Sequence, residues 1–263
     1  MRIQGFTLIE LVVTIIIIGI MGVGITSFIG RTTQGMIDTG ERQQLANTGW
    51  VVSEKVSREL RLALPNSIRT NAISPSSSGN CIEFIPIIAG SNYLSVPTLT
   101  ASNNFEIVPL INYVVNSAQD RVAVYPNALA GLYNLSAQGV ISSKVSSISN
   151  GVTANSTKLQ LASNHQFLTD SPTKRIYVVQ NPVMYCFSAG FLYRYSDYGF
   201  RANLPSSGLL NQTVIGSRLS AGTFNYTDST ITRSAIVTMA FNVVGASGAT
   251  QSINQEVQIR NVP

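Results

Sequence analysis

The chain opens with a long apolar run and continues with a polar, strand-rich remainder. Residues 6–30 contain a single charge, Glu10, and the stretch LVVTIIIIGIMGVGI within them is almost wholly aliphatic. As a helix rising ~1.5 Å per residue, this run is about 38 Å long, enough to cross a bilayer core of ~30 Å. A helix from a soluble core would keep a polar face. The pattern therefore predicts a transmembrane helix over residues 6–30.

An amphipathic helix is predicted over residues 31–64. Its apolar positions recur at steps of seven and four: Leu45, Val52, Val56, Leu60 and Leu64. This face is expected to pack on a globular head. Glu54 with Arg58 and Lys55 with Glu59 are expected to form exposed i,i+4 pairs. Pro65 ends the helix, because the residue before a proline is disfavoured in the α region. Three glycines leave its continuity with the first helix open: Gly35, Gly40 and Gly49.

Residues 65–263 predict a single β-rich head without internal repeats or interdomain linkers. Short apolar and β-branched runs predict strands at 81–88, 107–115, 121–125, 175–180, 183–188, 191–196, 213–219, 235–244 and 255–260. Ser188-Ala189-Gly190 is expected to join two of them as a hairpin. Polar segments 74–80 and 245–252 are expected to be surface loops. The whole pattern predicts an α+β fold, with one long helix packed on an antiparallel sheet.

The composition favours an extracytoplasmic protein over a nucleic-acid binder. Charged residues make up 11% of the chain, less than half of the roughly 25% usual in soluble proteins. The net charge is +5, but lysines and arginines are scattered, and the densest group is Arg58, Arg61 and Arg69. A nucleic-acid binder would gather its cations on one face. We therefore expect these arginines to lie on a solvated surface.

Glu10 is the exception within the apolar run. A carboxylate within a membrane helix costs about 2.5 to 3.5 kcal/mol even on lenient scales, so it requires compensation. One interpretation is that Glu10 lies near the helix start, where the macrodipole and the headgroup region tolerate it. The other is that a cation from a second molecule pairs with it. If the chain is cut after Gly5, the new α-amine of Phe6 on a neighbouring subunit would supply that cation.

The string Gly5-Phe6-Thr7-Leu8-Ile9-Glu10, after a short basic leader and before the apolar run, resembles the class III signal of type IV prepilins and type II secretion pseudopilins. The resemblance implies a leader of residues 1–5, cleavage between Gly5 and Phe6 by a prepilin peptidase, and methylation of Phe6. It also implies a single-pass protein of the bacterial inner membrane with its head in the periplasm. The implied partners are other minor and major pilins and the inner-membrane assembly platform, in a pilus at the cell surface.

One departure from the major pilins concerns the helix. Many major pilins carry a proline about 22 residues into the mature chain, where this sequence has Ser27, and no proline precedes Pro65. Local melting of the helix would instead use Gly19, Gly22, Gly24 and Gly30, each weaker than Ala by about 1 kcal/mol. The missing proline favours a minor subunit.

A second resemblance covers the later strands. Val183-Met184-Tyr185-Cys186, the segment 190–195 (GFLYRY), the segment 81–86 (CIEFIP) and the closing 259–263 (IRNVP) are similar to the MshO-type minor pilins of the mannose-sensitive haemagglutinin (MSHA) pilus. This resemblance implies a structural subunit for pilus initiation or tip assembly. A type II secretion minor pseudopilin, or a tip subunit that binds a host surface, chitin or DNA, remains the alternative.

The two cysteines, Cys81 and Cys186, each lie in an apolar, strand-like run and not in a metal-ligand spacing. If the head lies outside the cytoplasm, they are expected to form a disulfide. Closing a loop of about 100 residues would constrain the unfolded chain by up to ~4.7 kcal/mol on the entropic account. The alternative is a pair of buried free thiols.

No enzymatic chemistry is indicated, and no cofactor or metal ion is expected. His165 is the only histidine and has polar neighbours, which predicts a loop histidine instead of a catalytic base. Asp170, Asp197 and Asp228 are too far apart in sequence for a calcium loop. Alternating aromatics are expected to serve core and cross-strand packing instead of a sugar platform: residues 185, 187, 191, 193 and 195.

Overall fold

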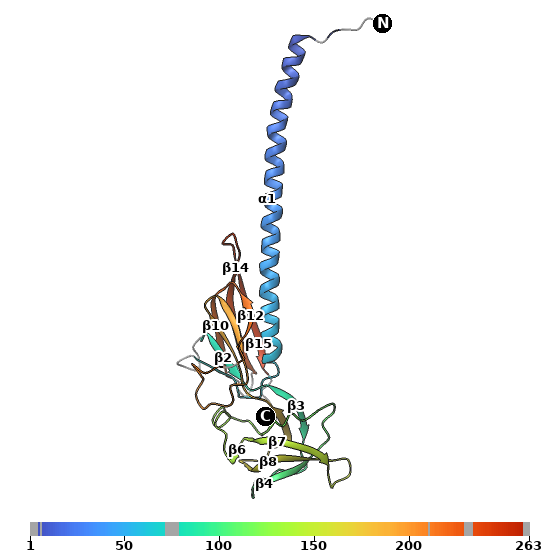
Figure 1. The fold of residues 1–263 in the computed structure, drawn as a ribbon, viewed down its shortest axis with the longest axis vertical. Helices are drawn as coiled ribbons and strands as arrows, with labels where there is room; N and C mark the ends of the chain where they lie inside the picture. The colour runs from blue at the N-terminus through green and yellow to red at the C-terminus, as the bar shows by residue number, and fades with distance from the viewer. Residues whose placement is uncertain (1–4, 6, 72–78, 210, 229–233, 260–263) are drawn as a thin grey trace.

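The computed structural model describes residues 5, 7–71, 79–209, 211–228 and 234–259. Helix α1 (Leu8–Leu60) is followed only by strands, so the α+β prediction is confirmed. The first half of α1 projects away from the head, and the second half packs against it (Figure 1). The side chains that face the head recur as the amphipathic pattern predicts, because Leu45, Val52, Val56 and Leu60 are all buried.

Helix α1 is unbroken through all of its glycines, and one of them has a packing role. A Cβ at Gly49 would lie 2.5 Å from the side chain of Ile253. The helix and strand β15 (Thr250–Ile259) therefore approach more closely than an alanine would allow. The continuity that Gly35, Gly40 and Gly49 left open in the sequence is thus decided, since α1 runs without a break from Leu8 to Leu60.

The helix ends four residues before the predicted boundary. Arg61 is the C-cap, and Leu64 N–H donates to Ile85 O at 2.8 Å instead of continuing the helix. Glu54 and Arg58 form the predicted i,i+4 pair at 3.5 Å. Glu59 does not pair with Lys55 as predicted, since its carboxylate accepts a hydrogen bond from Arg194 Nε at 3.0 Å. A partner from a strand thus replaces the expected partner on the helix.

The part of the head beside the helix holds two antiparallel sheets. The first has the order β1 (Arg69–Thr70), β2 (Cys81–Phe84), β10 (Val183–Ser188), β11 (Phe191–Tyr195) and β12 (Thr213–Ser217). The second has the order β13 (Leu219–Thr227), β14 (Ala235–Val244) and β15. Both share one core with the helix face, in which Phe224, Met239 and Tyr185 are almost fully buried. We call this half the proximal lobe.

The distal lobe lies beyond the end of α1 (Figure 1). Its sheet runs β3 (Ile87–Asn92), β9 (Arg175–Val179), β5 (Arg121–Val124), β7 (Ile141–Asn150), β8 (Thr157–Phe167) and β4 (Ser102–Ile107), and β6 (Gln138–Gly139) pairs with β8. It has its own core around Phe105, Val145 and Phe167. A further cluster that includes Leu64, Ile85 and Val179 joins the two lobes. The head expected as one domain therefore has two lobes with a shared joint.

Most predicted strands are present, and the failures have local causes. Predicted strand 81–88 is divided at Ile85-Pro86, because a proline has no N–H for a sheet ladder. Predicted strand 107–115 is wrong beyond Ile107, since Pro109 follows and Asn112 has a φ of 55°. The expected loop 245–252 is shorter, because β15 already begins at Thr250. Segment 74–80 falls mostly outside the described residues.

The predicted hairpin is confirmed. Ser188 pairs with Phe191 across β10 and β11, so only Ala189 and Gly190 form the turn. Their φ angles are 48° and 83°, as a two-residue turn of the primed type requires. On the adjacent β2–β10 pair, Cys81 and Cys186 are directly opposite and are joined by a disulfide with an S–S distance of 2.04 Å.

A carboxylate holds one loop of the distal lobe. Glu106 accepts hydrogen bonds from Val152 N–H at 2.7 Å, Thr153 N–H at 3.2 Å and Ser156 Oγ at 2.9 Å. These bonds, those to Thr153 first, lower the pKa of Glu106 to about 2. Because the pKa of Glu106 is lowered in the folded state, its ionised carboxylate stabilises the fold above the ordinary pKa of about 4.5. This stabilisation is lost as the pH falls towards 2.

We therefore expect loop 151–156 to loosen at acid pH. Amide hydrogen exchange at Val152 and Thr153 should become several-fold faster, relative to the intrinsic rate, between pH 5 and pH 2.5. The variant Glu106→Gln should show the faster relative exchange already at pH 5. Unchanged protection of these two amides in Glu106→Gln would contradict the role assigned to the carboxylate.

Candidate processing and assembly site

The start of α1 positions the residues predicted for processing. Gly5 is exposed and non-helical, whereas Phe6 lies outside the described residues. Thr7 is the N-cap with φ −79° and ψ 150°, and the helix begins at Leu8. The peptide bond after Gly5 thus lies one residue before the N-cap, so cutting it would leave the helix intact.

Glu10 folds back onto the helix cap. Its Oε2 accepts hydrogen bonds from Thr7 N–H at 3.3 Å and from Thr7 Oγ1 at 3.1 Å. A glutamate three residues after a threonine N-cap is the arrangement of a capping box. Glu10 therefore lies in the first turn of the helix, as the first of the two interpretations holds. In the described part of the chain no cation contacts Glu10.

The apolar surface of α1 is fully available to a lipid or a protein partner. Every described residue from Leu8 to Gly40 is exposed, including large side chains such as Ile18, Met21 and Phe28. Within the described residues, one helix is long and apolar enough to cross a membrane, and its apolar window has no buried residue. In water, such a continuous apolar surface would cause the protein to aggregate. The helix is suited to anchor the chain in a membrane.

Comparison with known families bears on this segment. Residues 1–26 match the prokaryotic N-terminal methylation motif. The motif supports a type IV pilin-like protein with a class III signal, and it implies a pilin or pseudopilin that a prepilin peptidase processes and that assembles with other pilins. No curated protein matches the chain. No solved structure matches the chain either.

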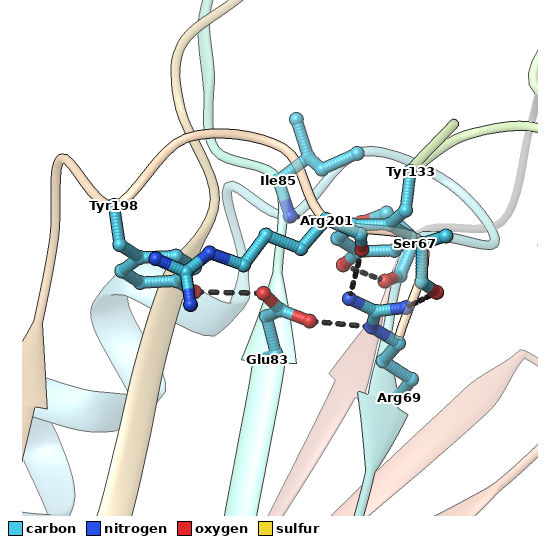
Figure 2. Close-up of polar contacts among 8 residues, drawn as sticks. Ser67, Arg69, Glu83, Ile85, Tyr133, Tyr198 and Arg201 are labelled. Carbon is cyan, nitrogen blue, oxygen red and sulfur yellow. Dashed lines mark hydrogen bonds and ion pairs between the residues drawn. The ribbon is translucent and has the colours of Figure 1, made fainter. Parts of the chain in front are cut away.

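The proximal lobe holds a buried polar network around Glu83 (Figure 2). One of its members, Tyr198, also packs in a cluster with Cys81 and Cys186. Glu83 of β2 is fully buried and accepts hydrogen bonds from Arg69 Nε and from Tyr198 Oη, the latter at 2.8 Å. Arg69 also donates to the carbonyls of Ala202 at 2.6 Å and Arg201 at 2.8 Å, and its guanidinium lies 3.6 Å from the centre of the Tyr133 ring.

Burial dominates the electrostatics of this network. It raises the pKa of Glu83, although the hydrogen bond and charge of Arg69 and the hydrogen bond of Tyr198 lower it. Burial, with the nearby Glu83 charge, also raises the pKa of Tyr198. Arg69 and Tyr198 enclose the Glu83 carboxylate from two sides. The network therefore holds segment 198–202 against β1 and β2. Sequence reasoning missed this network, because its members are far apart along the chain.

His165 is not a loop histidine as predicted. It lies on β8 and is fully buried, and its Nε2 donates to Gly139 O at 3.1 Å. Its ring contacts Phe167 edge-on with centroids 4.7 Å apart. Burial lowers its pKa, which keeps the imidazole neutral. Strand alternation turns His165 to the core while its polar neighbours face outward, and its described partners include no nucleophile.

The strand aromatics divide between two faces. Tyr185 and Phe187 are buried in the proximal core. Phe191, Tyr193 and Tyr195 lie on the outer face of β11 and pack along the strand, with ring centroids 5.6 and 6.2 Å apart. The carboxylate of Asp197 accepts hydrogen bonds from the side chains of Gln119 and Asn211. Among the described residues no group of three His, Cys, Asp or Glu is placed to hold a metal ion.

Proposed function

We propose that the chain is a minor pilin, a non-enzymatic structural subunit for the initiation or tip assembly of a type IV pilus of the MSHA type. The observation that carries the proposal is the methylation motif at residues 1–26, followed by a wholly exposed apolar helix. In a soluble enzyme such a surface would be exposed to water at a cost in free energy, whereas a filament buries it among neighbouring helices.

The assembly step follows from the charge of Glu10. Before assembly the helix spans the inner membrane, the head lies in the periplasm, and the carboxylate is held by Thr7 at the helix start. Removal of residues 1–5 would free the α-amine of Phe6. In a bundle of helices that amine on a neighbouring subunit would supply a cation for Glu10, which contacts none in the described part of its own chain. Low polarity inside the bundle would strengthen this attraction and fix the longitudinal register.

Two features support a minor subunit. The sequence has no proline before Pro65, and α1 is correspondingly continuous from Leu8 to Leu60. The head has two lobes instead of one small sheet, which suits a position with few neighbours, at the tip or in a priming complex. Assignment to the MSHA system rests on the strand motifs around Cys186 and Tyr193. A type II secretion pseudopilin shares these features, and adjacent secretion genes instead of pilus genes would favour it.

A tip subunit that binds a surface or DNA is the second candidate. The half-exposed aromatic row of β11 is the feature that favours it. Saturable binding of chitin or DNA by the full chain would support the function of a tip subunit.

Intact-mass spectrometry of the native protein tests the proposal directly. We expect a mature chain that begins at a methylated Phe6 and has lost residues 1–5. The same measurement, with and without reduction, should show Cys81 and Cys186 oxidised, because the periplasm favours disulfides. A mature chain that retains residues 1–5, or begins beyond Glu10, would refute the pilin assignment.

A further inference from the structure

A hollow of about 540 Å³ opens where the end of α1 meets the distal sheet. It lies over the paired strands β3 and β9 and is bordered by the segment that follows the helix. The lining residues that matter here are Arg61, Leu62, Ile87, Gly90, Arg175 and Tyr177. The apolar N-terminal helix and the Glu83 network do not contribute to it, so this surface is separate from the site described above.

Gly90 creates the space. It pairs with Tyr177 across β3 and β9. A Cβ at Gly90 would lie 3.7 Å from the Tyr177 ring and 3.7 Å from Ile176 O, which is ordinary contact. The backbone therefore tolerates a side chain here, and the missing side chain leaves the hollow open. The apolar part of its lining is accessible, since Leu62 is 55% exposed, and Ile88, on the same strand as Gly90, is 44% exposed.

The rim is positively charged without internal compensation. Arg61 is exposed and Arg175 half-exposed, and neither takes part in the three ion pairs found in the described part of the chain. Lys174, next to Arg175, is also exposed. Glu59, the acid closest to Arg61 in sequence, is engaged by Arg194. Two arginines beside an apolar floor are suited to carboxylates that carry apolar neighbours.

The position of the hollow narrows the possible partners. It lies about 30 helical residues beyond the apolar run, roughly 45 Å along the helix axis, so membrane lipids are out of reach. A second copy of this chain is disfavoured, because the protein has a net charge of +5 and would repel itself at a basic rim. Nucleic acid would require a longer track of cations and stacked rings. β3 is the terminal strand of its sheet, but its outer edge already bonds Leu62 O through Ile87 N–H and Val108 N–H through Asn92 O, so a partner would dock over the face of β3 and β9.

We propose that this hollow docks a short extended segment of a different protein, in which an acidic side chain lies between Arg61 and Arg175 and adjacent apolar side chains cover Leu62, Ile87 and Tyr177. A distinct acidic sister subunit is the kind of partner that this chemistry fits. The docking does not depend on cleavage after Gly5, so it can be tested apart from filament assembly.

The test measures fluorescence anisotropy with the full chain in detergent micelles. The probe is a fluorescein-labelled nonapeptide in which Asp and Val alternate, compared with its Asn–Val and Lys–Val counterparts and with a short oligothymidylate. We expect saturable binding of the Asp–Val peptide alone. Arg61→Glu combined with Arg175→Glu should weaken it by about tenfold or more, as expected when charge-assisted hydrogen bonds are lost. Gly90→Val should weaken it similarly by filling the hollow.

The matched control combines Arg42→Glu with Lys144→Glu, which makes the same change in net charge at exposed sites outside the hollow. Binding by this control should stay within about twofold of the unmodified chain, apart from screened long-range effects. An equal loss in the control, equal binding of the Asn–Val peptide, or absence of saturable binding would each overturn the proposal. Preferential binding of oligothymidylate that depends on Arg61 and Arg175 would replace it with a nucleic-acid site.

Discussion

Replacing Glu10 with Val is expected to leave cleavage after Gly5 intact and to remove the subunit from the filament. A charge pair at about 4 Å is worth roughly 4 kcal/mol at an effective dielectric constant of about 20. Desolvation of both groups offsets part of this, so we expect a loss of about tenfold or more in the subunit recovered from sheared pili. Immunoblots of sheared and cell-associated fractions measure the loss, and the mass of the mature chain reports processing.

The Thr7 contacts allow the two possible roles of Glu10 to be separated. Thr7→Ala removes the Oγ1 hydrogen bond to Glu10 but keeps both the carboxylate and the Thr7 backbone donor. If the intersubunit charge matters, Thr7→Ala should assemble normally and Glu10→Val should not. If helix capping matters, both variants should fail to the same extent. Normal incorporation of the Glu10→Val subunit would refute the assembly role altogether.

Replacing Arg69 with Met is expected to destabilise the head by about 3 to 5 kcal/mol, because it leaves the carboxylate of Glu83 buried without its cation. The Glu83 side chain has no exposed surface and that of Arg69 only 12%. For a domain of this size the change corresponds to a fall in Tm of about 6 to 20 °C. Thermal unfolding of the full chain in detergent, followed by circular dichroism, measures it.

The pH dependence of the stability loss in Arg69→Met tests whether the uncompensated charge of Glu83 causes it. Loss of Arg69 should raise the already raised pKa of Glu83 further. A carboxyl whose folded pKa is above its unfolded value contributes stability below the unfolded pKa, and this is lost as the pH rises through the folded pKa. The defect of Arg69→Met should therefore be larger at pH 7 than at pH 5. Adding Glu83→Gln should recover part of the lost stability.

Arg58→Met is the matched control for this substitution. Arg58 is 76% exposed and pairs with Glu54 at 3.5 Å, so its loss should cost about 0.5 kcal/mol or less. Equal destabilisation by Arg58→Met and Arg69→Met, or no recovery when Glu83→Gln is added, would show that the buried charge is not the cause.

Several strands were predictable, and several were not, for reasons visible in particular residues. β14 (AIVTMAFNVV) is rich in β-branched and aromatic residues, which marks it as a strand in the sequence, although Ile236 and Val244 occupy half-buried positions of its alternating pattern. β7 (ISSKVSSISN) and the middle of β8 contain mostly polar residues that face solvent, and neither has an apolar period. Pairing with neighbouring strands holds them extended, which no local pattern reports.

The residues proposed for processing are marked by a local motif, whereas the polar contacts of the head are not. Gly5, Phe6 and Glu10 form a contiguous motif, and the matched methylation motif over residues 1–26 includes all three. Arg194 lies 135 residues from Glu59, Tyr198 lies 115 residues from Glu83, and Gly139 lies 26 residues from His165. Contacts at such separations follow from the order of strands in the sheets, and that order has no local signal.

The amino-acid sequence by itself determined the elements whose physics is local. An apolar run without a polar face must lie in lipid or among other helices, a proline ends a helix or strand, and Ala189-Gly190 can close a hairpin. The tertiary structure alone decided which distant groups meet: the enclosure of Glu83 by Arg69, the burial of His165, and the hollow between α1 and β3. Burial in these places depends on how helix and sheets pack, and packing is a property of the whole chain.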